Sequence, residues 1–216
     1  MKYKAVLYDM DGTVLDSLSD LCNAVNHILE QYNMPTHDRM TIARNLGNGA
    51  RYLLAHCAPE GTSDELVDKM LKDYGPWYDS HCAILTAPYE GIIPMMETLR
   101  SAGVKQGVMS NKQDSAVKTL CEQYFPGLLE CALGESETVR RKPNPDAVLK
   151  ALEEMGIDKS EAIYVGDTEV DIQTSVNADM PCAVVTWGFR SKEELIAAGG
   201  KLFFDTADEL CAWLMD

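Results

Sequence analysis

The stretch that decides the fold is Val6-Leu7-Tyr8-Asp9-Met10-Asp11-Gly12-Thr13-Val14. The apolar run from Ala5 to Tyr8 is typical of a buried parallel strand, and it stops at two carboxylates spaced two residues apart. In an open α/β sheet, ligands bind beyond the carboxyl ends of the strands. The sequence therefore predicts that Asp9 and Asp11 face a substrate.

Two carboxylates this close repel each other unless a cation lies between them or one keeps its proton. Mg²⁺ fits because it takes one or two carboxylates and keeps waters and substrate phosphate oxygens as its other ligands. On Asp-x-Asp alone, a solvated acidic turn after the strand is an open alternative, since Asp and Gly are ordinary turn residues.

The composition excludes several classes of function. The chain has 216 residues, enough for a core domain with a smaller inserted one, and 46% of them are apolar. With 19 basic and 34 acidic residues, the formal charge is 19 − 34 = −15. This charge argues against binding to nucleic acid or to an anionic membrane. An anionic substrate therefore needs a local positive site.

The cysteines indicate a reducing compartment. All 7 are scattered, mostly within apolar runs, and no Cys-x-x-Cys occurs. We expect reduced cysteines and a cytoplasmic protein. No apolar run approaches the length of a signal core or a membrane span, so no membrane partner is expected.

Helical spacing of apolar residues dominates the first third of the chain after Thr13. The pattern predicts four helices, near residues 17–33, 40–46, 50–58 and 63–82. We expect a helical cap domain of residues 16–83, inserted into a catalytic core of residues 1–15 and 84–216.

The remainder alternates helix and strand, as a parallel sheet requires. The fold class predicted is α/β, a Rossmann-like parallel sheet core with an inserted helical-bundle cap domain. The predicted strands after the insert are Val104–Met109, Leu129–Leu133, Ala162–Val165, Pro181–Thr186 and Leu202–Phe204. The predicted helices between the strands include Ile92–Ser101, Asp114–Gln123, Asp146–Met155 and Glu169–Ala178.

Four strand ends or following loops carry chemically useful side chains. Parallel topology brings all these ends to one edge of the sheet, so together they predict one site. Taken singly, a helix cap or a solvated surface residue explains each of them equally well. The residues are Asp9, Asp11, Ser110, Asn111, Lys142, Asp167 and Asp171.

With these motifs the chain resembles the haloacid dehalogenase superfamily of phosphohydrolases. Asp9-Met10-Asp11-Gly12-Thr13 is similar to the first motif of that family, and Ser110, Lys142-Pro143 and Gly166–Asp171 are similar to the other three. Asp16–Leu21, the helical insert and Trp187-Gly188-Phe189 further resemble the phosphoglycolate phosphatase-like branch.

The resemblance implies a role for each residue of the first motif. Asp9 is expected to attack phosphorus and form an aspartyl-phosphate, which divides one difficult displacement into two easier ones. Asp11 is expected to protonate the leaving oxygen and later to take a proton from water. Mg²⁺ is expected to bind an Asp9 carboxylate oxygen, the Asp11 backbone carbonyl and Asp167.

The remaining residues are expected to bind the phosphoryl group. Lys142 supplies a fixed positive charge, and the Ser110 hydroxyl with the Asn111 backbone N–H supplies donors. Asp171 lies one helical turn after Asp167 and is expected to orient Lys142 or a metal-bound water.

The helical insert is expected to exclude water from the site and to select the substrate. Its candidate substrate loop contains Asn48, Gly49 and Arg51, because glycines let backbone approach a ligand and a helix start beside an arginine suits an anion. An ordinary helix-to-helix turn is an equally open interpretation of Gly47-Asn48-Gly49.

The predicted function is Mg²⁺-dependent hydrolysis of a small-molecule phosphate monoester, with phosphoglycolate as the best substrate guess. A sugar-phosphate mutase of the β-phosphoglucomutase type and a pyrophosphatase suit the same core. A phospho-accepting signalling protein is the alternative from another class. A dehalogenase is disfavoured by Asp11, and a phosphonate-cleaving enzyme is disfavoured because the only lysines of the insert, Lys69 and Lys72, fall on its outer helix.

Overall fold

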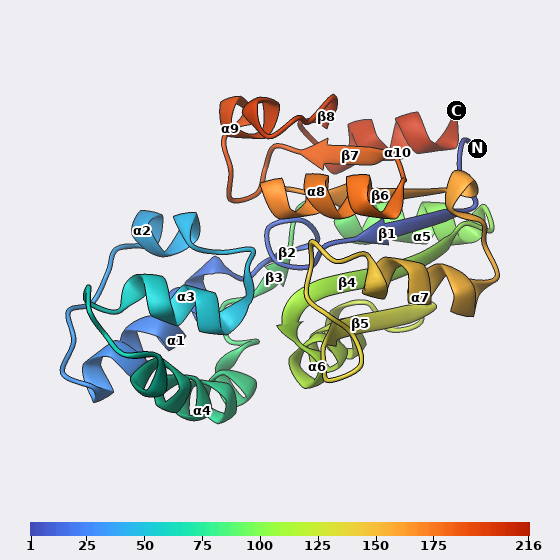
Figure 1. The fold of residues 1–216 in the computed structure, drawn as a ribbon. Helices are drawn as coiled ribbons and strands as arrows, with labels where there is room; N and C mark the ends of the chain where they lie inside the picture. The colour runs from blue at the N-terminus through green and yellow to red at the C-terminus, as the bar shows by residue number, and fades with distance from the viewer.

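The core of the protein is a six-stranded parallel sheet, seen on the right of Figure 1 in a computed structural model that describes residues 1–216. The strands follow one another in the order β5-β4-β1-β6-β7-β8. Their bounds are Ala5–Tyr8 (β1), Lys105–Gln113 (β4), Cys131–Glu135 (β5), Ala162–Gly166 (β6), Cys182–Val185 (β7) and Leu202–Phe204 (β8).

Helices cover both faces of the sheet, and the alternation of side chains along β1 shows why. Val6 and Tyr8 pack into the same buried cluster as apolar residues of α5, α6 and α10, whereas Ala5 and Leu7 pack against α7. The core helices are α5 (Ile92–Ser101), α6 (Asp114–Tyr124), α7 (Asp146–Met155), α8 (Glu169–Ala178), α9 (Lys192–Ala197) and α10 (Ala207–Met215), with a 3₁₀ turn at Lys159–Glu161.

The helical insert consists of α1 (Leu18–Gln31), α2 (Arg39–Arg44), α3 (Gly49–Cys57) and α4 (Asp64–His81). These four helices lie together beyond the carboxyl ends of the sheet strands (Figure 1). Each presents apolar residues at helical spacing to the others, such as Ile28 on α1 and Met70 on α4, both fully buried. The predicted α/β fold class with a helical bundle is confirmed.

Two features differ from the sequence prediction. Strand β4 runs on to Gln113, so Ser110 and Asn111 lie within the strand and not beyond its end. A small antiparallel pair, β2 (Leu15–Asp16) with β3 (Ala87–Pro88), joins the two chain segments that connect the core to the insert. Neither segment has an apolar pattern of its own, because each strand is only two residues long.

Candidate active site

Three neighbouring strands in the middle of the sheet bring the predicted residues together. Strands β4, β1 and β6 are adjacent. Ser110 lies in the second half of β4, and Asp9 and Asp167 directly follow β1 and β6. Lys142 comes from the loop between β5 and α7. The sheet order thus gathers residues that are more than 150 positions apart in the chain.

Asp9 lies at the centre of this group and is 5% exposed. Its Oδ1 forms an ion pair with the Lys142 Nζ at 2.7 Å and accepts a hydrogen bond from the Met10 backbone N–H at 2.7 Å. Burial, and next the neighbouring Asp171, raise the pKa of Asp9 well above its ordinary value, while Lys142 opposes the rise. With both contacts on Oδ1, the Oδ2 atom is the oxygen left for another partner.

Lys142 is buried between two carboxylates. Its Nζ donates to Asp171 Oδ1 at 2.8 Å and to the Tyr164 hydroxyl at 3.1 Å, besides its contact with Asp9. Burial by itself lowers the pKa of Lys142, but Asp171 and Asp9 outweigh burial and raise it well above the ordinary value. The two carboxylates thus favour the charged form of Lys142 in the floor of the site.

Both carboxylate oxygens of Asp171 accept hydrogen bonds from neighbouring residues. Besides binding Lys142, it accepts hydrogen bonds through Oδ2 from the Thr168 backbone N–H at 3.0 Å and from the Thr168 hydroxyl at 2.7 Å. These bonds cap the first turn of α8. Of the two roles expected for Asp171, the contacts favour the orientation of Lys142.

Asp167 is fully buried and closely surrounded. It accepts hydrogen bonds from the Thr13 hydroxyl at 2.7 Å and from the Phe189 backbone N–H at 2.8 Å. A Cβ atom on Gly12 or on Gly188 would come within 2.3 Å of its Oδ2, so both positions require glycine. Burial, and next Asp171, raise the pKa of Asp167 to about 7.

The chemistry of this group suits a hard divalent cation. Carboxylate oxygens of Asp9, Asp167 and Asp171 lie within 4.8 Å of one another, all three residues buried. When all three are ionised they carry three negative charges, and Lys142 supplies one positive charge. The group then has a net charge of −2, which a divalent cation would balance. Because Asp171 is occupied by Lys142 and Thr168, Asp9 and Asp167 are the side chains left to bind a metal.

Asp11 lies on the other side of the turn and is not part of the carboxylate cluster. Its Oδ1 accepts a hydrogen bond from the Ser17 hydroxyl and is 3.1 Å from the Lys112 Nζ. Its side chain is 19% exposed and lines the cavity above Asp9. The turn that starts at Asp9 thus directs its two carboxylates to different neighbours.

Asn111 connects the helical insert with the core. Its side-chain amide donates to the Gly47 carbonyl at 2.8 Å and to the Lys142 carbonyl at 3.0 Å, and its side-chain oxygen accepts from the Lys142 backbone N–H at 2.7 Å. Ser110 lies beside it, 7% exposed, and lines the cavity. The contacts of the Asn111 side chain were not foreseen from the sequence, which suggested only its backbone N–H.

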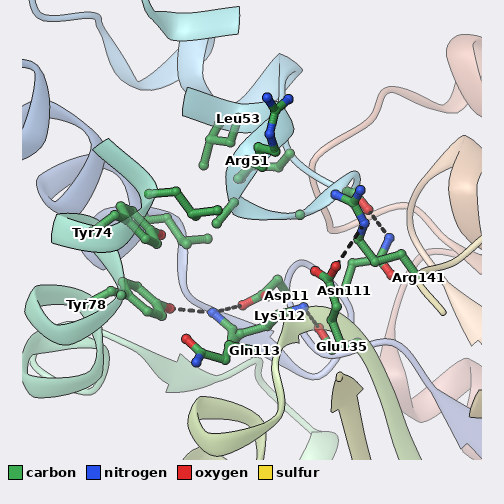
Figure 2. Close-up of a pocket in the computed structure, with 18 of the residues that line it drawn as sticks. Asp11, Arg51, Leu53, Tyr74, Tyr78, Asn111, Lys112, Gln113, Glu135 and Arg141 are labelled. Carbon is green, nitrogen blue, oxygen red and sulfur yellow. Dashed lines mark hydrogen bonds and ion pairs between the residues drawn. The ribbon is translucent and has the colours of Figure 1, made fainter. Parts of the chain in front are cut away.

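The core and the insert enclose a cavity of about 530 Å³ over Asp9 and Asp11. Figure 2 shows Tyr74 and Tyr78 of α4 on one side of the cavity, Asn111 of β4 on the other side, and Lys112 and Gln113 of β4 below Tyr78. The two tyrosine rings are stacked, with centroids 5.4 Å apart. The cavity is therefore built jointly, because neither unit alone supplies all its walls.

The predicted substrate loop contacts the core directly. The Asn48 carbonyl accepts a hydrogen bond from the Arg141 Nη1 at 3.1 Å, and a Cβ atom on Gly49 would lie 3.2 Å from the Asn111 carbonyl. Arg51 also lines the cavity, but its guanidinium is bound by Asp64 and Asp68 of α4. In Figure 2 it points away from Asp11. Asn48 and Gly49 thus lie close to the core residues of the site, whereas Arg51 is already paired with two carboxylates of the insert.

Arg190, a core residue that the sequence analysis did not single out, also contacts the insert. It donates to the Ala43 and Leu46 carbonyls at the end of α2, at 3.0 and 2.8 Å, and pairs with Glu169. Lys112 and Tyr78 were likewise not foreseen, although Lys112 follows Ser110 and Asn111 directly in the sequence.

No helix of the structure has the length and apolarity needed to cross a bilayer.

Fold and site together define a class, an α/β enzyme core with a buried acidic site at the strand ends under a helical insert. Residues 6–185 match the sequence pattern of the haloacid dehalogenase-like hydrolases. The chain belongs to this family, and the resemblance drawn from its motifs is confirmed.

Similar proteins include several phosphatases. The chain is 29% identical to the phosphoglycolate phosphatase of Aquifex aeolicus, over 86% of this chain and 86% of that protein. It is 28% identical to the N-acetylmuramic acid 6-phosphate phosphatase of Pseudomonas aeruginosa, over 90% and 86%. A crystal structure from Lactobacillus delbrueckii subsp. bulgaricus, provisionally named a phosphoglycolate phosphatase, matches with 36% identity and a TM-score of 0.93 over 99% of both chains.

Proposed function

We propose that this chain is a Mg²⁺-dependent phosphatase that hydrolyses a small-molecule phosphate monoester, with phosphoglycolate as its substrate. The observation that carries the proposal is the pair of carboxylates on one turn. Asp9 is buried against Lys142, while Asp11 lines the cavity two residues later. The relatives named as phosphoglycolate phosphatases support the choice of substrate.

The first step is an attack of an Asp9 carboxylate oxygen on phosphorus, which forms an aspartyl-phosphate and breaks the ester bond. Asp11 gives its proton to the leaving oxygen. In the second step Asp11 takes a proton from water, whose oxygen attacks phosphorus and frees Asp9 together with inorganic phosphate. The position of Asp11 on the cavity side of the turn supports both of its roles.

The negative charge of the phosphoryl group is stabilised by fixed donors. Lys142, kept charged by Asp171, and the Ser110 hydroxyl are placed on the wall of the cavity beside Asp9. Asp9 and Asp167, with the backbone carbonyl of Asp11, are the proposed ligands of Mg²⁺. When bound, the metal neutralises phosphoryl charge.

The helical insert acts in this proposal as a cap of residues 16–83 over a core of residues 1–15 and 84–216. Its contacts with Asn111, Arg141 and Arg190 support a state in which the cap closes the cavity. Closure keeps bulk water away from the phosphoryl group. All 7 cysteines are free, which supports a cytoplasmic, reducing location.

The proposal is tested by phosphate release from p-nitrophenyl phosphate and from phosphoglycolate. We expect many turnovers per chain with Mg²⁺ and none after EDTA treatment, with activity restored when Mg²⁺ is added back. A single burst of one phosphate per chain would identify a phospho-accepting protein instead. Turnover of neither ester would refute the phosphatase proposal.

A further inference from the structure

The buried lysine at the other end of the cavity, Lys112, has no role in the mechanism above. Its side chain is only 6% exposed, although it lines the cavity. Its Nζ lies 3.1 Å from Asp11 Oδ1 and donates a hydrogen bond to the Tyr78 hydroxyl. It also lies 4.3 Å from the centre of the Tyr78 ring. Because an ammonium group has three donors, one N–H remains for a ligand.

The other cations around the cavity are engaged elsewhere or exposed. Arg51 is bound by Asp64 and Asp68, and Arg141 pairs with Glu135 at 3.1 Å. Lys72 lies at the surface. Lys142 is bound to Asp9 and Asp171 at the phosphoryl end. Lys112 is thus the buried cation of the cavity with a donor left over.

The position of Lys112 relates it to the leaving group. This step rests on the proposed function, in which Asp11 protonates the leaving oxygen. Figure 2 shows Lys112 beside Asp11, which places it on the side of the cavity into which the leaving alcohol extends. Lys142 pairs instead with Asp9, the residue that receives the phosphoryl group. Tyr78 of the insert closes this side over Lys112.

We propose that Lys112 is a specificity-determining residue that binds an anionic group of the leaving alcohol, one or two atoms from the ester oxygen. A carboxylate or a second phosphate fits this chemistry, because either accepts a charge-assisted hydrogen bond from the free N–H. Tyr78 holds the ammonium in place once the insert covers the cavity. A buried cation of this kind disfavours neutral alcohols, which leave its donor unpaired.

The test compares phosphoglycolate with ethyl phosphate, which has a methyl group where phosphoglycolate has the carboxylate. Both esters need a proton from Asp11, so the ratio of their kcat/KM values measures the contribution of the carboxylate alone. We expect the wild type to prefer phosphoglycolate, and Lys112→Met to reduce this ratio by about 10- to 100-fold, the loss typical of a hydrogen bond to a charged group. Pyrophosphate against ethyl phosphate is the second arm, which distinguishes a phosphate from a carboxylate.

Lys72→Met is the matched control, because it removes the same charge from the exposed rim of the same cavity. We expect it to leave the ratio within about twofold of the wild type, since an exposed charge is well screened. Should Lys112→Met fold poorly, as judged by circular dichroism, Lys112→Gln is measured in its place.

The inference and the proposed function fail in different ways. A wild type that turns over ethyl phosphate but prefers neither phosphoglycolate nor pyrophosphate supports the phosphatase and overturns the role of Lys112. An equal loss of preference in Lys72→Met also overturns the role of Lys112, because the effect would then come from the total positive charge around the cavity and not from one contact. Absence of turnover with phosphoglycolate, ethyl phosphate, pyrophosphate and p-nitrophenyl phosphate refutes the phosphatase itself.

Discussion

The two buried lysines of the cavity, Lys142 and Lys112, have different kinds of surroundings. The Lys142 side chain contacts only core residues, namely Asp9 after β1, Tyr164 on β6 and Asp171 in the first turn of α8. Lys112 also lies at the end of a core strand, but it reaches across to Tyr78 of the helical insert. The Lys142 side chain is therefore held within the core, whereas the Lys112 side chain is held by both units.

This difference separates the two tasks of the proposed enzyme. At the Lys142 end, the side-chain hydrogen bonds and ion pairs of Asp9, Lys142 and Asp167 are all made within the core. At the Lys112 end, a change in α4 alters the surroundings of the leaving group without touching Asp9 or Asp167. Reaction type is then set by the sheet, and choice of substrate by the joint between the units.

The largest effect is expected at the Lys142 end. Lys142→Met removes the fixed positive charge beside Asp9 and should lower kcat/KM by about 10³-fold for every phosphate ester alike, because the phosphoryl group is common to all. Steady-state kinetics with phosphoglycolate and ethyl phosphate checks this. A loss confined to the anionic ester would remove the distinction between the two ends.

A large effect on stability is expected where the two units are joined. Asp20 of α1 is 2% exposed and accepts hydrogen bonds from the backbone N–H groups of Ile84, Leu85 and Thr86 and from the Thr86 hydroxyl. Asp20→Ala leaves these donors without a partner and should lower the free energy of unfolding by about 2–4 kcal/mol.

Urea unfolding checks the Asp20 prediction, with the exposed Asp208→Ala as the control. We expect the control to change the free energy of unfolding by less than about 0.5 kcal/mol. If Asp20→Ala is as stable as the control, the linker is not held by this carboxylate, and the placement of the insert has another origin.

The sequence predicted the Lys142 end far better than the Lys112 end, and the reason is physical. Asp9, Lys142 and Asp167 follow strands, and parallel topology alone brings strand ends to one edge. The bounds of helices such as Asp146–Met155 were predicted correctly because their apolar spacing is local.

Contacts between the two units are not encoded by any local pattern. Lys112 meets Tyr78 at a separation of 34 residues, and Arg190 meets Leu46 at a separation of 144. The antiparallel pair of β2 and β3 was missed for the same reason, since its strands are two residues long and lie far apart in the chain. The pairing of Arg51 with Asp64 and Asp68 also depends on how α3 packs against α4.

The Lys142 end should also show a pH dependence of stability in the metal-free protein. The pKa of Asp167 is raised from 3.8 to about 7 in the folded protein, chiefly by burial. Between these values the folded state binds a proton that the unfolded state has lost, so stability falls as pH rises from about 4 to about 7. Asp167→Asn, which cannot ionise, should lack this loss.

Urea midpoints in EDTA at about pH 5 and about pH 7.5 check the Asp167 prediction. We expect the wild type to lose stability relative to Asp167→Asn over this interval. Parallel pH dependences of the two proteins would mean that the Asp167 carboxyl group is already ionised at pH 5. The positive charge around it would then suffice without a metal ion.

The smallest effect is expected for Tyr78→Phe at the Lys112 end. The ring stays near the ammonium, but the hydrogen bond from Lys112 to the hydroxyl is lost. The Lys112 side chain is therefore positioned less firmly for the substrate anion. The preference for phosphoglycolate over ethyl phosphate should fall by about 3- to 10-fold, the value of one ordinary hydrogen bond. Equal losses for both esters would show that Tyr78 does not act through the leaving group.

The central claim is that Asp9 carries the phosphoryl group between the two steps, and Asp11→Asn tests it most directly. Without Asp11 to take a proton from water, the aspartyl-phosphate should accumulate when an ester with a good leaving group is supplied. After acid quenching of the reaction with ³²P-labelled p-nitrophenyl phosphate, the account predicts label on the peptide that contains Asp9, and none in the double variant with Asp9→Asn. Label on another residue, or turnover that persists in Asp9→Asn, would contradict it.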